Sequence, residues 1–336
     1  MKAEFQILFF IILNLLIFIK KKNFCNYINI VDKPNLKRKI HTSKAYLVGG
    51  HIFFLNIILY SILNYNNLNN SFFFFNYVHI LSFFVSIIFI FFLGVLDDKY
   101  DLSPYTKTFV LALVFYFLVE VDGTLVIESL SFNYFDFKLN LKGISIFFSI
   151  ICCMILINAF NMFDGINMQL ALYVLSIICV LIFKFPINYF LILIFFLLVF
   201  FLFLNYRGFI FLGNSGSFLL SFIIIFFILK YYNLKKLISA EEVVLLLIYP
   251  VLDLLRLFVI RIANGKNPFV ADNNHIHHIF LTLFKYNLSV FIIFLSYFIP
   301  HFLYFFLNFN FVFCLLLLLL FYSLIFIFKY CKIIKF

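Results

Sequence analysis

The sequence predicts an all-α polytopic membrane protein with about eleven transmembrane helices and a small external β-hairpin. Of its 336 residues, 66% are hydrophobic and 57 are Phe, which is more apolar surface than a soluble domain of this length needs. The apolar residues form stretches near the length that crosses a bilayer, and charged residues collect between them. We therefore expect one integral-membrane domain over residues 1–336.

Each apolar stretch is expected to form one spanning helix. The predicted spans are 4–19, 44–64, 77–96, 105–121, 144–161, 168–184, 186–204, 217–232, 241–262, 287–307 and 311–329. The first is a helix rather than a cleavable signal, because its basic cluster Lys20-Lys21-Lys22 follows the apolar run. In the ninth, Pro250 is expected to kink the helix.

Basic residues predict the orientation of these spans. The first connection is rich in Lys and Arg, which places it in the cytoplasm, and alternation then makes loops 97–107, 158–167, 205–216 and 263–286 cytoplasmic as well. One loop disagrees: 230–242 should be external, yet it carries Lys230, Lys235 and Lys236. The stronger bias of the first loop decides the prediction.

Segment 123–142 has a different pattern. Apolar and polar residues alternate along it, with Phe135, Phe137 and Leu139 separated by Asp136 and Lys138. This period of two predicts the external β-hairpin.

The net charge of +11 could indicate nucleic acid in a soluble protein. In a membrane protein it indicates positive-inside topology and anionic lipid or nucleotide phosphate, so no nucleic-acid partner is expected. The six Cys form no CxxC pair and most lie in apolar runs, which indicates reduced core residues rather than a metal or disulfide set.

Four polar motifs interrupt the apolar chain, and all four fall in the predicted cytoplasmic loops. The first holds Asp97, Asp98 and Asp101, a cluster of oxygen ligands that suits Mg²⁺. The alternative is a solvated acidic loop. In the second, Asn158, Asn161 and Asp164 share one face of a helical continuation. The alternative there is hydrogen bonding between helices.

The third motif, residues 213–217, is a glycine-bracketed turn at the start of a helix, where free backbone N–H groups favour a phosphate. The pattern is also that of an ordinary capped loop. The fourth contains His275, His277 and His278 behind Asp272, and with so many carboxylates elsewhere, contact with phosphate is favoured over zinc.

Together these residues resemble the polyprenyl-phosphate N-acetylhexosamine-1-phosphate transferases, the WecA/TagO-like branch related to the MraY translocases. The resemblance covers nearly the whole chain and its motifs occur in family order. It is carried by Asp32-Lys33-Pro34-Asn35, Arg38-Lys39, His41, Gly49-Gly50, 94–98, 158–165, 211–213, Pro250, Asp253, Arg256, Arg261, Pro268-Phe269 and 272–278.

The resemblance implies that a polyprenyl phosphate attacks the sugar-bearing phosphorus of a UDP-N-acetylhexosamine, GlcNAc favoured, and that UMP is released. It implies Mg²⁺, or Mn²⁺ as an alternative, held by Asp97, Asp98, Asp164 and Asn214. The implied catalytic residues are Asp97, Asp98, Asp164, His277 and His278. The implied substrate contacts are Lys33, Arg38, Lys39, Asn158, Asn161, Gly213, Ser215, Arg261, Asp272 and His275.

The implied setting is a bacterial cytoplasmic (inner) membrane, with the active site facing the cytoplasm and a homodimer compatible with the sequence.

Two departures from the family pattern stand out: Asn214 and Asn167 occupy positions where the family usually has acids. They leave open a non-catalytic lipid- or nucleotide-binding relative. A peptidoglycan enzyme with a muramoyl-pentapeptide donor is the alternative within the family, and a transporter is disfavoured because the polar residues gather at one face.

Overall fold

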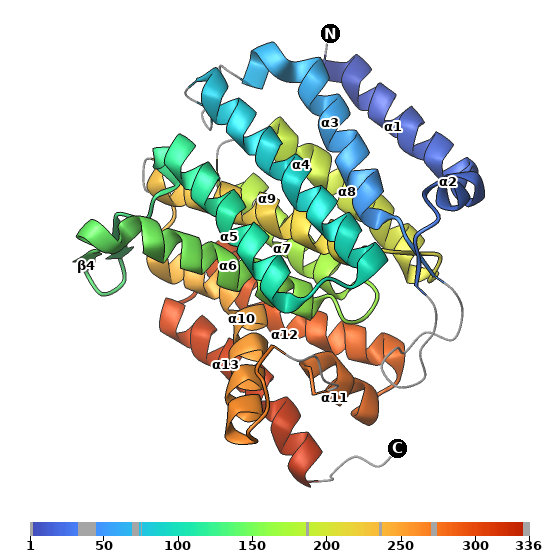
Figure 1. Cartoon of the computed structure of the whole chain (residues 1–336). Coiled ribbons are helices and arrows are strands. Elements are labelled where there is room, and N and C mark those ends of the chain that lie inside the picture. Colours follow the sequence, from blue (N-terminus) through green and yellow to red (C-terminus); the bar gives the residue numbers. More distant parts are fainter. Residues whose placement is uncertain are drawn as a thin grey trace.

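The computed structural model describes residues 3–32, 45–68, 74, 76–185, 188–234, 237–269 and 274–331. This part of the chain forms a bundle of long helices with two small sheets (Figure 1). The all-α membrane architecture predicted from hydropathy is confirmed.

The long helices follow the predicted spans closely. They are α1 (Ala3–Ile19), α3 (Gly49–Leu68), α4 (Tyr77–Tyr100), α5 (Pro104–Val121), α6 (Ser145–Phe163), α7 (Gln169–Lys184), α8 (Tyr189–Tyr206), α9 (Gly213–Asn233), α10 (Ala240–Ala263), α12 (Tyr286–Leu307) and α13 (Phe311–Cys331). Two helices were not predicted, α2 (Lys21–Ile28) and α11 (Ile276–Leu283), and α10 continues through Pro250.

Not every long helix meets the length and hydropathy expected of a membrane span. Within the described residues, seven segments do, and they contain α4, α5, α6, α8, α9, α10 and α12. Four shorter apolar segments, in α1, α3, α7 and α13, complete the set of predicted spans.

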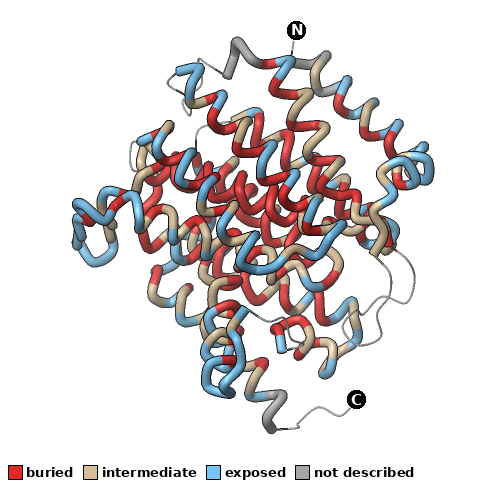
Figure 2. The backbone as a smooth tube through the Cα atoms, viewed as in Figure 1, coloured by how far each residue is buried: buried red, intermediate tan, exposed pale blue. Residues whose placement is uncertain are grey.

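Helix α9 is the centre of the bundle. It packs against α3, α4 and α6, and every residue of its best apolar window is buried inside the protein. Figure 2 shows the buried residues concentrated in the middle of the bundle and the exposed ones on the outer helices. The neighbouring helices therefore hold the residues at both ends of α9 in place.

The predicted hairpin is present as β3 (Ser129–Phe132) and β4 (Phe137–Asn140), paired antiparallel between two 3₁₀ turns, η1 (Gly123–Leu125) and η2 (Lys142–Ile144). Its β3 strand docks on α9, because the Tyr232 hydroxyl accepts from the N–H of Ser131 and donates to the carbonyl of Ser129.

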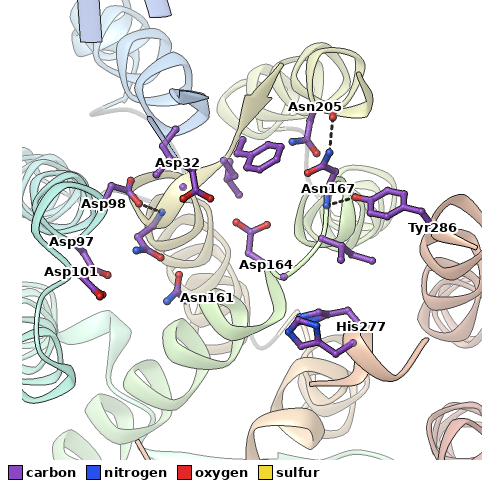
Figure 3. A pocket seen from close by; sticks show the side chains of 18 residues that line it. Asp32, Asp97, Asp98, Asp101, Asn161, Asp164, Asn167, Asn205, His277 and Tyr286 are labelled. Carbon is purple, nitrogen blue, oxygen red and sulfur yellow. Dashed lines mark hydrogen bonds between the residues drawn. The ribbon is translucent and has the colours of Figure 1, made fainter. Parts of the chain in front are cut away.

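A second sheet was not predicted. It joins β1 (Val31–Asp32), β2 (Ala45–Leu47) and β5 (Ile210–Phe211), with β1–β2 antiparallel and β2–β5 parallel. This sheet ties the first predicted cytoplasmic loop to the segment that leads into α9. It thereby brings Asp32 next to the motif at the start of that helix (Figure 3).

Lys230 resolves part of the conflict in the charge pattern. The charge pattern assigns it to the loop 230–242, but it lies within α9 and is fully buried. Its Nζ is 2.5 Å from Oδ2 of Asp122 and 2.6 Å from Oγ1 of Thr124. A paired, buried lysine is not a topogenic loop charge, so it no longer argues against the predicted orientation.

Candidate active site

The four polar motifs meet at one cavity of about 650 Å³ (Figure 3). It lies where the ends of α4 and α6, the start of α9 and the short α11 converge. Its polar lining consists of Asp32, Asp97, Asp98, Asp101, Asn161, Asp164, Asn167, Asn205, Asn214, His277, His278 and Tyr286. The convergence predicted from the topology count is therefore present in the fold.

Asp98 is held by the N-terminus of α9. Its two carboxylate oxygens accept from the backbone N–H groups of Asn214, at 2.7 Å, and of Ser215, at 3.1 Å. Gly213 is required here, because it has φ +73° and a Cβ would lie 2.7 Å from Oδ2 of Asp98. The two N–H groups that were expected to be free for a phosphate thus bind this carboxylate, and Ser215 is buried beneath the cavity lining.

Asp97 has a different role from its neighbour. Its carboxylate, on a residue that is only 3% exposed, accepts from the N–H of Leu102 at 3.0 Å and pairs with Nζ of Lys107 at 3.1 Å. These contacts fasten the end of α4 to the start of α5. The charge of Asp97 is therefore already paired with a cation, whereas the Asp98 carboxylate is held by backbone N–H groups.

Asp164 follows directly after α6 and points into the cavity (Figure 3). Desolvation, followed by the negative charge of Asp98, raises the pKa of its carboxyl to about 7. A bound cation would relieve both effects by stabilising the ionised form. Asp164 and Asp98 thus share a site in which negative charge is in excess.

The two asparagines of the second motif separate. The side-chain oxygen of Asn161 accepts from the Ser217 hydroxyl at 2.5 Å, and this residue lines the cavity. Asn158 does not line it; its amide donates to the carbonyl of Met154 at 2.7 Å, one helical turn back. Only Asn161 and Asp164 of this motif face the cavity.

The histidine motif lies at the start of α11, where His277 and His278 line the cavity. His277 is 2% exposed and its ring lies against the backbone of Gly165, where a Cβ would be 1.9 Å from Cε1. Burial, and then the nearby His275 and His278, lower its pKa well below the usual range, so the imidazole is neutral. Within the described residues, Nδ1 of His277 is buried and has no hydrogen-bond partner.

Several cavity residues were not predicted as site residues. The backbone N–H of Asn167 donates to the Tyr286 hydroxyl at 2.8 Å, and its side chain donates to the carbonyl of Asn205 at 3.3 Å. Asn205 in turn accepts from the N–H of Met168 at 2.5 Å. Asp32 stood in a quoted motif without a role, whereas single polar residues such as Asn205 and Tyr286 give no signal in an apolar run.

The remaining predicted site residues lie elsewhere. Arg261 is buried away from the cavity and donates to the carbonyl of Pro268 at 2.6 Å. His275 does not line the cavity; its Nδ1 is 3.2 Å from Oδ2 of Asp253. Four predicted substrate contacts fall outside the described residues: Lys33, Arg38, Lys39 and Asp272.

The cavity contains oxygen-bearing side chains that could hold a divalent cation. No group of three or more His, Cys, Asp and Glu is arranged as a metal site anywhere in the described part of the chain. Asp98 and Asp164 nevertheless line one cavity with Asn214, which offers a neutral oxygen. This set fits Mg²⁺, which is commonly held by one or two carboxylates and completes its shell with substrate phosphates and water.

Comparisons with known proteins agree with the motifs. Residues 80–232 match glycosyl transferase family 4. The undecaprenyl-phosphate alpha-N-acetylglucosaminyl 1-phosphate transferase of Yersinia pestis is 26% identical over 278 residues, which are 76% of this chain and 70% of that protein. The Escherichia coli K12 protein of the same name is 26% identical over 280 residues, with the same coverage. That of Haemophilus influenzae is 26% identical over 278 residues, or 76% and 72% of the two chains.

These matches confirm the resemblance that the motifs indicated: over 76% of its length the chain is similar to proteins named undecaprenyl-phosphate alpha-N-acetylglucosaminyl 1-phosphate transferase, and residues 80–232 match glycosyl transferase family 4.

Proposed function

We propose that this chain transfers a sugar 1-phosphate, with N-acetylglucosamine 1-phosphate favoured, from a UDP-sugar to undecaprenyl phosphate and releases UMP. The product would be the first intermediate of a lipid-linked cell-surface glycan. The convergence of all four polar motifs on one cavity, at the end of a membrane-helix bundle, is the observation that carries this proposal. The names of the relatives favour N-acetylglucosamine over a muramoyl-pentapeptide donor.

The chemistry is a displacement at phosphorus. An oxygen of the lipid phosphate attacks the phosphorus that bears the sugar, a new P–O bond forms, and the P–O bond to UMP breaks. A phosphate monoester has its second pKa near ~6, so the nucleophile is mostly ionised at neutral pH and needs no strong general base. The protein is then required to align two anionic substrates and to neutralise their charge.

The side chains around the cavity suit this task. Asp98 is immobilised by two backbone N–H groups, so its position is set before a ligand arrives. His277 is a neutral imidazole buried against Gly165, placed to contact a phosphate oxygen without adding a fixed charge. Bound Mg²⁺, or Mn²⁺ as an alternative, would be held chiefly by Asp98 and Asp164 and would neutralise the diphosphate.

A donor panel tests the proposal. The purified chain in detergent is given undecaprenyl phosphate with UDP-GlcNAc, UDP-GalNAc, UDP-glucose or UDP-MurNAc-pentapeptide, and UMP release is measured with and without Mg²⁺. We expect UMP from UDP-GlcNAc and loss of activity with a chelator. Lack of UMP from every donor would refute the transferase, and activity created only by Asn214→Asp would favour the non-catalytic relative instead.

We also propose that the cavity faces the cytoplasm of a bacterial inner membrane. Single cysteines beside cavity residues of the four motifs, introduced into intact cells, should react with a membrane-impermeant thiol reagent only after the inner face is exposed. A cysteine beside Tyr134 in the hairpin should react from outside, as the matched control. Labelling of any cavity position from outside would contradict this orientation.

A further inference from the structure

A buried hub of polar groups lies behind the histidine motif and outside the cavity. Its centre is Asp253 of α10, which is 2% exposed. Asp253 does not line the cavity. A buried carboxylate must be hydrogen-bonded or paired, so the identity of its partners indicates what it organises.

The partners of Asp253 come from three helices. Oδ1 accepts from Nη2 of Arg256 at 2.7 Å and lies 3.5 Å from the Tyr322 hydroxyl of α13. Oδ2 lies 3.2 Å from Nδ1 of His275. The N–H of Ile276, the first residue of α11, is 3.2 Å from Oδ1 and 3.4 Å from Oδ2. The carboxylate thus caps α11 and binds the residue before it.

Arg256 completes the hub. Besides its pair with Asp253, its Nη2 donates to the carbonyl of Asn274 at 2.6 Å, and its Nε donates to Tyr322 at 3.1 Å. The segment that enters α11 is therefore bound at three consecutive residues, Asn274, His275 and Ile276. Such multiple attachment fixes both the position and the rotation of a helix that is only 8 residues long.

This fixation reaches the cavity through stacked rings. The rings of His275 and His277 are parallel within 9°, with centroids 5.3 Å apart, and the His277 and His278 centroids are 4.4 Å apart. His277 in turn rests on Gly165, the residue after Asp164. A rotation of α11 would therefore move His277 off the loop that carries Asp164.

We propose that Asp253, with Arg256 and His275, is a positioning unit that sets His277 against the Asp164 loop for the transfer reaction, and that His275 belongs to this unit rather than to the substrate contacts. The inference rests on the proposed function for its kinetic consequences. Only a carboxylate presents acceptors on both atoms; an amide at 253 would turn N–H donors toward either Arg256 or His275.

A double-mutant cycle tests the proposal, with UMP release as the assay. We expect Asp253→Asn to lower kcat/KM about tenfold in the wild-type background, because small misplacements of aligned groups are costly. In the His277→Ala background the same substitution should change kcat/KM less than about twofold, because the group that it positions is already gone. Equal losses in both backgrounds would overturn the proposal.

Asp122→Asn is the matched control. It also removes a fully buried carboxylate from an ion pair, with Lys230, but at the opposite end of α9 from Gly213. Any general loss of stability that it causes should act equally in both His277 backgrounds. Coupling of Asp122→Asn to His277 as strong as that of Asp253→Asn would show that the effect is not specific to the hub, and would also overturn the proposal.

The reactivity of an introduced thiol tests the positioning unit without an activity assay. In a His277→Cys variant, the buried thiol should react slowly with a small methanethiosulfonate reagent, and several-fold faster once Asp253→Asn releases α11. Asp122→Asn should leave that rate unchanged. If Asp253→Asn left the rate of thiol reaction unchanged, the positioning role would be refuted. Absence of UMP release by the wild type would instead count only against the proposed transferase function.

Discussion

Replacing Asp98 should cost stability as well as activity, because the carboxylate caps the central helix. Asp98→Ala removes the acceptor of two backbone N–H groups, at 2.7 and 3.1 Å, at the N-terminus of α9. A buried donor left without a partner costs about 1–3 kcal/mol, and loss of a helix cap about 0.5–2 kcal/mol. Because two N–H groups lose their acceptor and the two effects overlap, we expect a loss of about 2–4 kcal/mol.

The assay is the apparent melting temperature of the purified protein in detergent, measured beside UMP release. Asp98→Ala should lower that temperature by about 5 °C and abolish transfer. Asp98→Asn should also abolish transfer but recover about half of the stability, because its one amide oxygen can accept from one of the two N–H groups. The Asp98→Asn variant therefore separates the charge of the site from the cap of the helix.

Asp97→Asn serves as the control, since that carboxylate binds Leu102 and Lys107 rather than the backbone N–H groups at the start of α9. The reasoning is refuted if Asp98→Ala melts like the wild type, because a cap whose removal has no effect is not holding the helix. It is also refuted if Asp98→Ala retains normal transfer, because the carboxylate would then be structural alone.

Three further outcomes are expected. Asn214→Asp should lower the Mg²⁺ concentration needed for half-maximal activity, because it adds a carboxylate to the cavity wall. That carboxylate adds about 4 kcal/mol of attraction per unit cation charge at 4 Å and an effective dielectric of 20, before repulsion from the existing acids is subtracted. An unchanged Mg²⁺ dependence in an active enzyme would place Asn214 away from the metal. The Mg²⁺ concentration needed for half-maximal activity should also fall as the pH rises from about 6 to about 8. Burial and then the charge of Asp98 raise the pKa of Asp164 to about 7, and the proton must leave before a cation binds. An Asp164→Asn variant with residual activity should lose this pH dependence, and a flat profile in the wild type would contradict Asp164 as a cation ligand. Lys230→Met should destabilise the protein by about 3–5 kcal/mol, because the buried Asp122 carboxylate loses its lysine partner. A second change, Asp122→Leu, should recover much of that loss in a thermal-melting assay, and a double variant no more stable than Lys230→Met would argue against the pair.

The helices could be predicted from the sequence because hydropathy is a local property. Each apolar stretch coincides with one long helix, and the period of two in 123–142 correctly indicated the hairpin. The small sheet could not be predicted, since its strands are two or three residues long. The pairing of Tyr46 with Ile210 also joins distant parts of the chain.

The site was predictable in outline for a related reason. Charge bias placed four polar motifs on one face, and folding brings residues of all four to one cavity. Sequence could not show how each residue is engaged. The capping of α9 by Asp98 and the pairing of Lys230 with Asp122 both depend on contacts between segments more than 100 residues apart.

The burial of α9 also has a consequence for assembly in the bilayer. Because its apolar window contacts protein on all sides, α9 can enter the lipid as a single hydrophobic segment but must later exchange its lipid neighbours for helices. The neighbours α3, α4 and α6 are all synthesised before it, whereas α11 emerges from the ribosome well after it. The wall that contains Asp98 can therefore close while the chain is still growing, and the histidine side can be added only after α10 has been inserted. A nascent chain that stops short of α11 would hold a capped central helix but no complete cavity.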